Sequence, residues 1–147
     1  MWQRKVSMKK YSQFHDGSFE GFWIDGITVH VYLSTLEKER FTVVNEGVVA
    51  VAAGGFRAGN IVFDVVSRNH KEITLRDIEE LYDLREGPAG ESQGMRQLGK
   101  AQKEELTLFE ISPSYGATCM VLAHSVDVLE RNEWFARYSN KRQTRGG

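Results

Sequence analysis

A histidine and an aspartate lie next to each other at His15 and Asp16, and this pair has the clearest capacity for chemistry in the chain. Imidazole and carboxylate groups bind metal ions and transfer protons near neutral pH. In metal sites that use such a pair it lies on a helix with further histidines on other helices, whereas here Gly17 and a strand-like run follow. Because Asp-Gly favours turns, we predict a structural turn at His15-Asp16. A small hydrolase or ligand-binding site in this region is the alternative.

The other side chains that could take part in catalysis are scattered along the chain. His30, His70 and His124 lie far apart in the sequence and form no H-x-x-x-H or H-E-x-x-H pattern, so we expect no metal site. Arg57 lies in the glycine-rich run AAGGFRAGN, but neither the P-loop nor the dinucleotide pattern is present, so we expect no cofactor. The catalytic candidates are therefore His15, Asp16, Arg57 and His124.

The single cysteine and two serines near it offer no nucleophile of a known arrangement. Cys119 lies between apolar residues in a strand-like run, which predicts a buried and inert thiol. One cysteine also cannot form an internal disulfide. Ser112 and Ser114 lie between two strand-like runs, whereas the serine of the G-x-S-x-G motif lies between a strand and a helix.

Charge is distributed unevenly along the 147 residues, although the net charge is only −1. Residues 1–10 and residues 131–147 each carry +4, while residues 11–130 hold 10 basic and 19 acidic side chains. An acidic body attracts basic partners, because opposite potentials steer association. It also disfavours nucleic acid as a partner, even though the basic ends carry aromatic residues.

The carboxylates are densest between residues 76 and 86, where five carboxylates occur with two arginines. Leu75, Ile78 and Leu81 recur at helical spacing and predict an apolar stripe that faces the core. The opposite face then points outward. We predict that this outer face binds a basic protein, and its residues are Glu79, Glu80, Asp83 and Glu86.

The elements that must position these residues are mostly strands. Asp25-Gly26 predicts a hairpin turn between SFEGFWI and ITVHVYLS. In the second run Ile27, Val29, Val31 and Leu33 share one face, and Thr28, His30, Tyr32 and Ser34 share the other, which we expect to be wet. Four further runs predict strands: RFTVVNEGVVAVAAGGF, with a break near residues 45–47, NIVFDVVS, LTLFEIS and ATCMVLAHSVDVLE.

One helix is expected at about 75–86. Thr74 and Asp77 form a T-x-x-D variant of the capping box, and Gly87-Pro88 matches the residues that end helices. The glycine-rich residues 87–104 lack an apolar stripe and predict a long mobile loop, with a short helix in GMRQLGKAQKEE as the alternative. The fold class is therefore α+β: a mostly antiparallel sheet of six or seven strands, either curved or a partial barrel, with one main helix.

The length fits a single domain over residues 1–147, with frayed basic ends at 1–10 and 139–147. No apolar run is long enough to cross a bilayer, so we expect no membrane partner. The first residues lack the apolar run of a secretory signal, which together with the cysteine count predicts a cytoplasmic protein.

Two runs, FHDGSFEGFWIDGITVHVYL and EGVVAVAAGGFRAGNIVFDV, resemble uncharacterised small bacterial proteins. These share an HDG opening, an alternating strand, a G-V strand and an F-R-x-G-N-I turn into a strand. The resemblance covers about residues 14–66 and implies a bacterial origin. No activity attaches to it, so it assigns no catalytic residue. By analogy of build alone, small acidic α+β bacterial proteins include immunity proteins that neutralise toxins.

These observations favour a non-enzymatic protein-binding module, similar in build to immunity proteins, that binds a basic partner through an acidic surface. A homodimer is compatible with the sequence. The alternative is a small hydrolase or ligand-binding enzyme that uses the region of His15 and Asp16.

Overall fold

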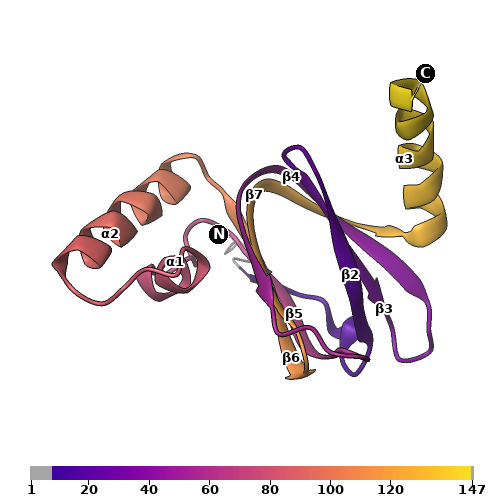
Figure 1. The fold of residues 1–147 in the computed structure, drawn as a ribbon, viewed down its shortest axis with the longest axis horizontal. Coiled ribbons are helices and arrows are strands. Elements are labelled where there is room, and N and C mark those ends of the chain that lie inside the picture. The colour runs from indigo at the N-terminus through magenta and orange to yellow at the C-terminus, as the bar shows by residue number, and fades with distance from the viewer. Residues whose placement is uncertain (1–7, 147) are drawn as a thin grey trace, which may run out of the picture.

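The computed structural model describes residues 8–146, with side chains up to residue 139, and within this range the chain has an α+β fold (Figure 1). The strands are β1 (Met8–Lys10), β2 (Ser18–Asp25), β3 (Thr28–Ser34), β4 (Arg40–Gly54), β5 (Ile61–Arg68), β6 (Thr107–Tyr115) and β7 (Thr118–Glu130). The helices are a short 3-10 helix η1 (Ser12–Phe14) and the α-helices α1 (Leu75–Leu81), α2 (Pro88–Lys103) and α3 (Arg131–Gly146).

The strands form one antiparallel seven-stranded sheet, which confirms the predicted fold class. Their order is β1-β5-β2-β3-β4-β7-β6, and because β5 also pairs with β6 the sheet closes in a ring. Alternate side chains of each strand point into the ring and fill it. Among the largest fully buried ones are Phe14, Phe19, Phe109 and Leu33.

The hairpin predicted at Asp25-Gly26 is present, with its turn one residue later. Asp25 pairs with Thr28, so the two loop residues are Gly26 and Ile27, and Gly26 has a φ of 63°. Ile27 is therefore exposed in the turn and does not lie on the inner face of β3. Val29, Val31 and Leu33 do point inward, as expected.

The expectation that the other face of β3 is wet is wrong. His30 is 0% exposed and Ser34 is 6% exposed. Trp134 and Tyr138 of α3 contact the His30 ring from outside. A strand pattern shows which residues share a face, but it does not show that a distant helix covers that face.

β4 is one long strand where the sequence suggested a break near residues 45–47. It pairs with β7 from Phe41 opposite Glu130 to Gly54 opposite Thr118, with an irregularity between Val48 and Ala50. Gly47 has a φ of 66°, and a Cβ there would lie 2.7 Å from Cδ2 of His124. The glycine therefore bends the strand without ending it.

α1 begins where the capping box predicts. Oγ1 of Thr74 accepts from the backbone N–H of Asp77, and Oδ2 of Asp77 accepts from the N–H of Thr74. The helix ends at Leu81, five residues before the expected end. Asp83 takes a left-handed φ of 52°, and the N–H of Leu84 donates to the carbonyl of Glu79, a pairing that closes a helix end.

The prediction of a long loop at 87–104 is wrong, because residues 88–103 form α2. Gly87 and Pro88 start this helix, since proline fits the first helical position, where no backbone N–H is needed. The buried face consists of Gly94 and Ala101, with the partly buried Leu98 between them. These small residues pack through a narrow stripe. Because they are weakly hydrophobic, the sequence shows no apolar periodicity here, and the segment was predicted to be a loop. That this segment is mobile stays a prediction.

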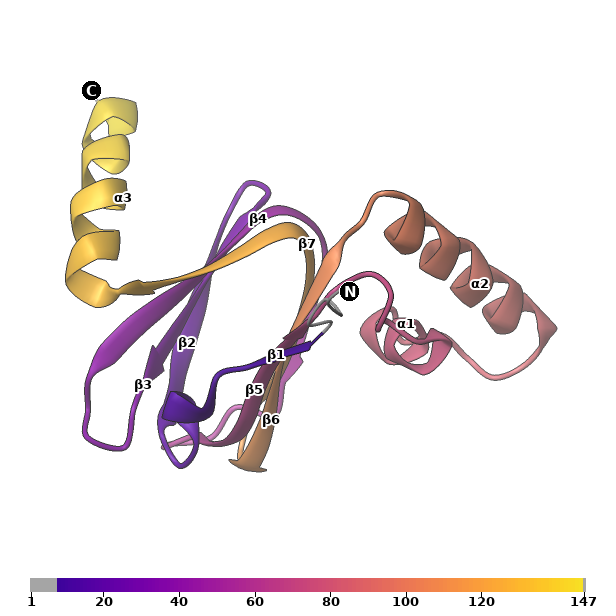
Figure 2. The same ribbon diagram turned by 180° about the vertical axis from the view of Figure 1, so that it is seen from behind.

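The helices lie outside the ring, at opposite ends of the molecule (Figures 1 and 2). α1 and α2 pack at one end, where Ile78 and Leu81 join a core with Leu108 and Leu122 of β6 and β7. α3 follows β7 at the other end. Its helical backbone continues to Gly146, and β1 pairs with β5, so residues 139–146 are helical and residues 8–10 form a strand, while the fraying of these ends stays a prediction. Residues 1–7 and 147 lie outside the described range.

None of the described helices combines the length and the apolar character needed to cross a membrane.

Candidate functional site

His15 and Asp16 lie in the turn between η1 and β2. Nδ1 of His15 donates to the backbone carbonyl of Phe63 at 2.8 Å, and its ring packs edge-on against that phenyl ring. Nε2 of His15 lies 3.6 Å from Oδ2 of Asp16, and both side chains are more than half exposed. Asp16 has a φ of 63°, which a turn requires. The contacts agree with the predicted structural turn.

The remaining catalytic candidates make contacts in other parts of the molecule. Nε2 of His124 on β7 lies 3.7 Å from Oε1 of Glu104. Arg57 is exposed, and its backbone N–H donates to Oδ1 of Asn60. No group of three histidine, cysteine or carboxylate side chains that could hold a metal ion occurs among the described residues.

Cys119 points into the filled interior of the ring. Burial raises the pKa of its thiol to about 12. Since the thiolate is the reactive species, this cysteine is inert at neutral pH.

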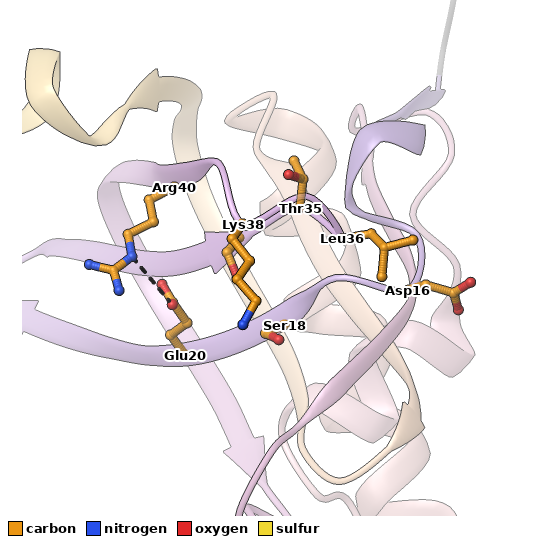
Figure 3. A pocket seen from close by; sticks show the side chains of 8 residues that line it. Asp16, Ser18, Glu20, Thr35, Leu36, Lys38 and Arg40 are labelled. Carbon is orange, nitrogen blue, oxygen red and sulfur yellow. Dashed lines mark ion pairs between the residues drawn. The ribbon is translucent and has the colours of Figure 1, made fainter.

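A polar hollow of about 290 Å³ lies beside the turn, and its lining includes Asp16 (Figure 3). The carboxylate of Glu20 there is bound by two arginines: Oε1 lies 3.0 Å from Nη2 of Arg131, and Oε2 lies 3.9 Å from Nε of Arg40. Lys38 also lines the hollow and holds a left-handed φ of 71°. The charges of the hollow largely cancel, so its lining has no strong preference for either sign of ligand.

A buried ion cluster lies beneath α1. Nη1 of Arg68 lies 2.8 Å from both carboxylate oxygens of Asp77, and Nη2 lies 2.6 Å from Oε1 of Glu110. Burial raises the pKa of Glu110, and Arg68 opposes that rise. Burial alone would lower the pKa of Arg68, but the two carboxylates outweigh it and raise the pKa. The single guanidinium therefore pairs with both carboxylates, and the partly buried cluster keeps a net charge of −1.

The carboxylates predicted to bind a partner are arranged differently. Glu80, Asp83 and Glu86 are exposed, and Glu79 is half-buried. Among the described residues, none of these four carboxylates lies within ion-pair distance of a cation. Their charge is thus directed at solvent and open to a partner.

A second hollow, of about 370 Å³, adjoins these carboxylates. Glu80 and Glu110 line it together with apolar residues that include Pro113 and Met120. Apolar walls with a carboxylate rim suit a long basic side chain, whose stem is apolar and whose head is charged. The sequence separates Glu80 from Glu110 by a helix and a strand, so only the fold could have shown this hollow.

In comparisons with known proteins, no family model, curated protein or solved structure matches this chain.

Proposed function

We propose that this protein is a protein-binding module that binds a basic partner through the acidic surface of α1 and the turn after it. We define the acidic surface as Glu79, Glu80, Asp83 and Glu86. The observation that carries the proposal is the contrast between two sets of carboxylates. Asp77 and Glu110 are each paired with Arg68, whereas the acidic surface is left without cations among the described residues.

Electrostatic repulsion among the carboxylates of the acidic surface supports the proposal of a basic partner. Glu79 and Glu80 lie in α1, and Asp83 and Glu86 lie in the turn after it, so four like charges fall within a short segment and repel one another. Lysines and arginines of a partner would relieve that repulsion and speed association. The hollow between Glu80 and Glu110 gives one such side chain a place to enter. Immunity proteins, which bind toxins, are the model for such a module by analogy of build.

The alternative, a small hydrolase that uses His15 and Asp16, has less support. Both side chains are more than half exposed, and His15 is engaged with a backbone carbonyl. A catalytic base needs neighbours that orient it and a site that excludes water. In the hollow at Asp16, the other carboxylate of the lining, Glu20, is already paired with Arg131 and Arg40.

Binding kinetics test the proposal. The parent protein is used to retain partners from an extract, and each retained protein is purified for rate measurements. We expect a basic partner whose association rate falls steeply as salt rises, because screening weakens exposed charges. Changing all four residues of the acidic surface to glutamine should slow association and leave dissociation nearly unchanged.

A matched control variant removes the same number of negative charges from outside the acidic surface. Glu37, Glu39, Glu105 and Glu130 are exposed carboxylates outside the acidic surface, and changing all four to glutamine should slow association much less. Equal rates for the parent and the acidic-surface variant across salt would contradict the proposal. So would retention of the same proteins by both.

A further inference from the structure

A cluster of aromatic rings joins α3 to the outer face of the sheet. His30 of β3 is fully buried, and its ring stacks on Trp23 of β2 with the centroids 4.7 Å apart. Trp134 and Tyr138 of α3 contact the same imidazole edge-on, at centroid distances of 5.7 and 4.8 Å. Residues four apart lie on one face of a helix. α3 therefore docks with one face against the ring of His30.

The hydrogen bond within this cluster fixes the protonation state of His30. Nε1 of Trp134 lies 2.9 Å from Nδ1 of His30. An indole nitrogen can only donate, so Nδ1 must accept and carries no proton. The docked state therefore requires the neutral imidazole with its proton on Nε2. A proton on Nδ1 would set one N–H against another and break the bond.

The start of α3 is fastened independently of His30. Nε of Arg131 donates to Oγ1 of Thr42 at 3.0 Å, and Nη2 donates to the carbonyl of Phe41 at 2.9 Å. These contacts anchor the first turn on the rim of β4. The first turn can therefore stay attached while the rest of the helix moves away from the sheet.

The second anchor of α3 lies one turn beyond Trp134. The hydroxyl of Tyr138 donates to Oε1 of Glu46 at 3.3 Å, and its ring covers Val44 and Leu129. Among the side chains that the structure describes, this buried cluster has three members. The bond at His30 is therefore a substantial part of what holds this half of the contact.

We propose that α3 is a pH-sensitive latch, in which protonation of His30 at Nδ1 breaks the bond from Trp134 and releases the helix from the sheet. Release leaves the anchor at Arg131 in place. It uncovers the outer face of the sheet at Trp23, Val44 and Leu129. The latch lies at the opposite end of the molecule from the acidic surface (Figure 1) and does not rest on the proposed function.

The groups around His30 decide what its protonation costs. The described titratable and charged side chains on the elements packed there are Glu20 and Asp25 of β2, Tyr32 of β3, Arg40 and Glu46 of β4, Cys119, His124, Asp127 and Glu130 of β7, and Arg131, Glu133, Arg137 and Tyr138 of α3. Glu46 is engaged by the hydroxyl of Tyr138. Stacking on Trp23 favours a cation. The docked helix holds Nδ1 as an acceptor for Trp134 and buries the ring, and both disfavour the protonated imidazole, so protonation favours the undocked helix.

Methyl NMR tests the latch in the whole protein. Val44 and Leu129 report on the covered face, and Val121, inside the ring, reports on the fold. Between about pH 8 and about pH 5, where histidine titrates, we expect the methyl signals of Val44 and Leu129 to shift in a single step. Those of Val121 should stay unchanged. Amide exchange of α3, corrected for its intrinsic pH dependence, should rise about tenfold, the effect of losing one buried hydrogen bond.

Two variants separate the latch from simple instability. His30→Asn keeps an acceptor oxygen near the place of Nδ1 but does not titrate, so the step should vanish. Trp134→Phe keeps a ring but removes the donor, so exchange of α3 should already be fast at the higher pH and the step should shrink. Nitrogen NMR of the parent ring should show Nδ1 gaining its proton in the same step, which holds even if His30→Asn fails to fold.

Four results would overturn the latch. The first is the absence of the step in the parent protein, and the second is its persistence in His30→Asn. The third is protonation of the ring while α3 stays docked. The fourth is a joint shift of Val121, because His30 would then support the whole fold and not one helix.

Discussion

The two helical ends of the ring are attached by different means. α1 and α2 cover β4, β6 and β7 through a continuous apolar core, whose buried members are Ile73, Ile78, Leu81, Ala101, Leu106, Leu108, Met120 and Leu122. α3 covers the opposite end through a small buried cluster and a set of directional polar contacts at Arg131, Trp134 and Tyr138.

This difference bears on how each end responds to its surroundings. Apolar burial is non-directional and does not depend on protonation, so the α1–α2 end should open only with the whole fold. A directional polar contact is weakened when its donor or acceptor changes protonation state. The α3 end should therefore open locally, at a lower free energy than the rest of the fold.

Arg68→Met should have the largest effect of the changes considered at the α1–α2 end. It leaves the carboxylates of Asp77 and Glu110 partly buried and without a cation, at a cost of about 3 kcal/mol in the free energy of unfolding. Urea unfolding measures this. Arg76→Met, on the exposed side of α1, is the matched control and should change stability by less than about 0.5 kcal/mol.

If the two arginine variants were equally stable, the ion cluster would not be part of what holds α1 to the sheet. The comparison between the two ends would then rest on the apolar core alone.

Local sequence patterns predicted the parts of the fold that depend on neighbours in the chain. The capping box at Thr74 and Asp77 is formed by residues three apart, and the hairpin after Asp25 by a turn of two residues. The alternation of Val29, Val31 and Leu33 likewise follows from the strand period alone.

The parts that the sequence did not predict depend on contacts between distant segments. α2 was missed because its contact stripe uses Gly94 and Ala101, which carry almost no hydropathic signal. His30 was placed on a wet face because Trp134, its cover, lies 104 positions later. Residues with a chemical role in the fold, such as Arg68 and Glu110, belong to no motif.

The candidate site residues also divide into those that local sequence predicts and those that depend on contacts between distant segments. The turn at His15-Asp16 was predictable because it depends on Asp-Gly chemistry within the chain. The exposure of Glu80, Asp83 and Glu86 follows from helix periodicity and the turn after it. The hollow between Glu80 and Glu110 needed the packing of α1 against β6, which no single-strand or single-helix pattern contains.

Thr74→Ala should have an intermediate effect and sharpens the comparison. It removes the acceptor for the backbone N–H of Asp77 and should lower the free energy of unfolding by about 1 kcal/mol. Because the α1–α2 end opens with the whole fold, exchange should accelerate by the same factor in α1 and in the slowest amides of β7. Acceleration confined to α1 would show that this end also opens locally, and the two ends would be alike.

The smallest expected effect is a loss of α3 docking at alkaline pH, caused by ionisation of the Tyr138 hydroxyl. Burial raises the pKa of its hydroxyl, and Glu46 raises it further while Arg137 lowers it. A raised pKa means that the docked helix favours the neutral phenol. The resulting stabilisation is complete below the ordinary tyrosine pKa and is lost as pH rises through the raised value. Amide exchange of α3, corrected for its intrinsic rate, should therefore accelerate at high pH, while exchange in α1 should not.

Tyr138→Phe removes the titrating group together with one hydrogen bond, so exchange in α3 should be a few-fold faster at neutral pH and independent of this alkaline step. An alkaline step of the same size in Tyr138→Phe would assign it to another group, and the second anchor of α3 would then be apolar only.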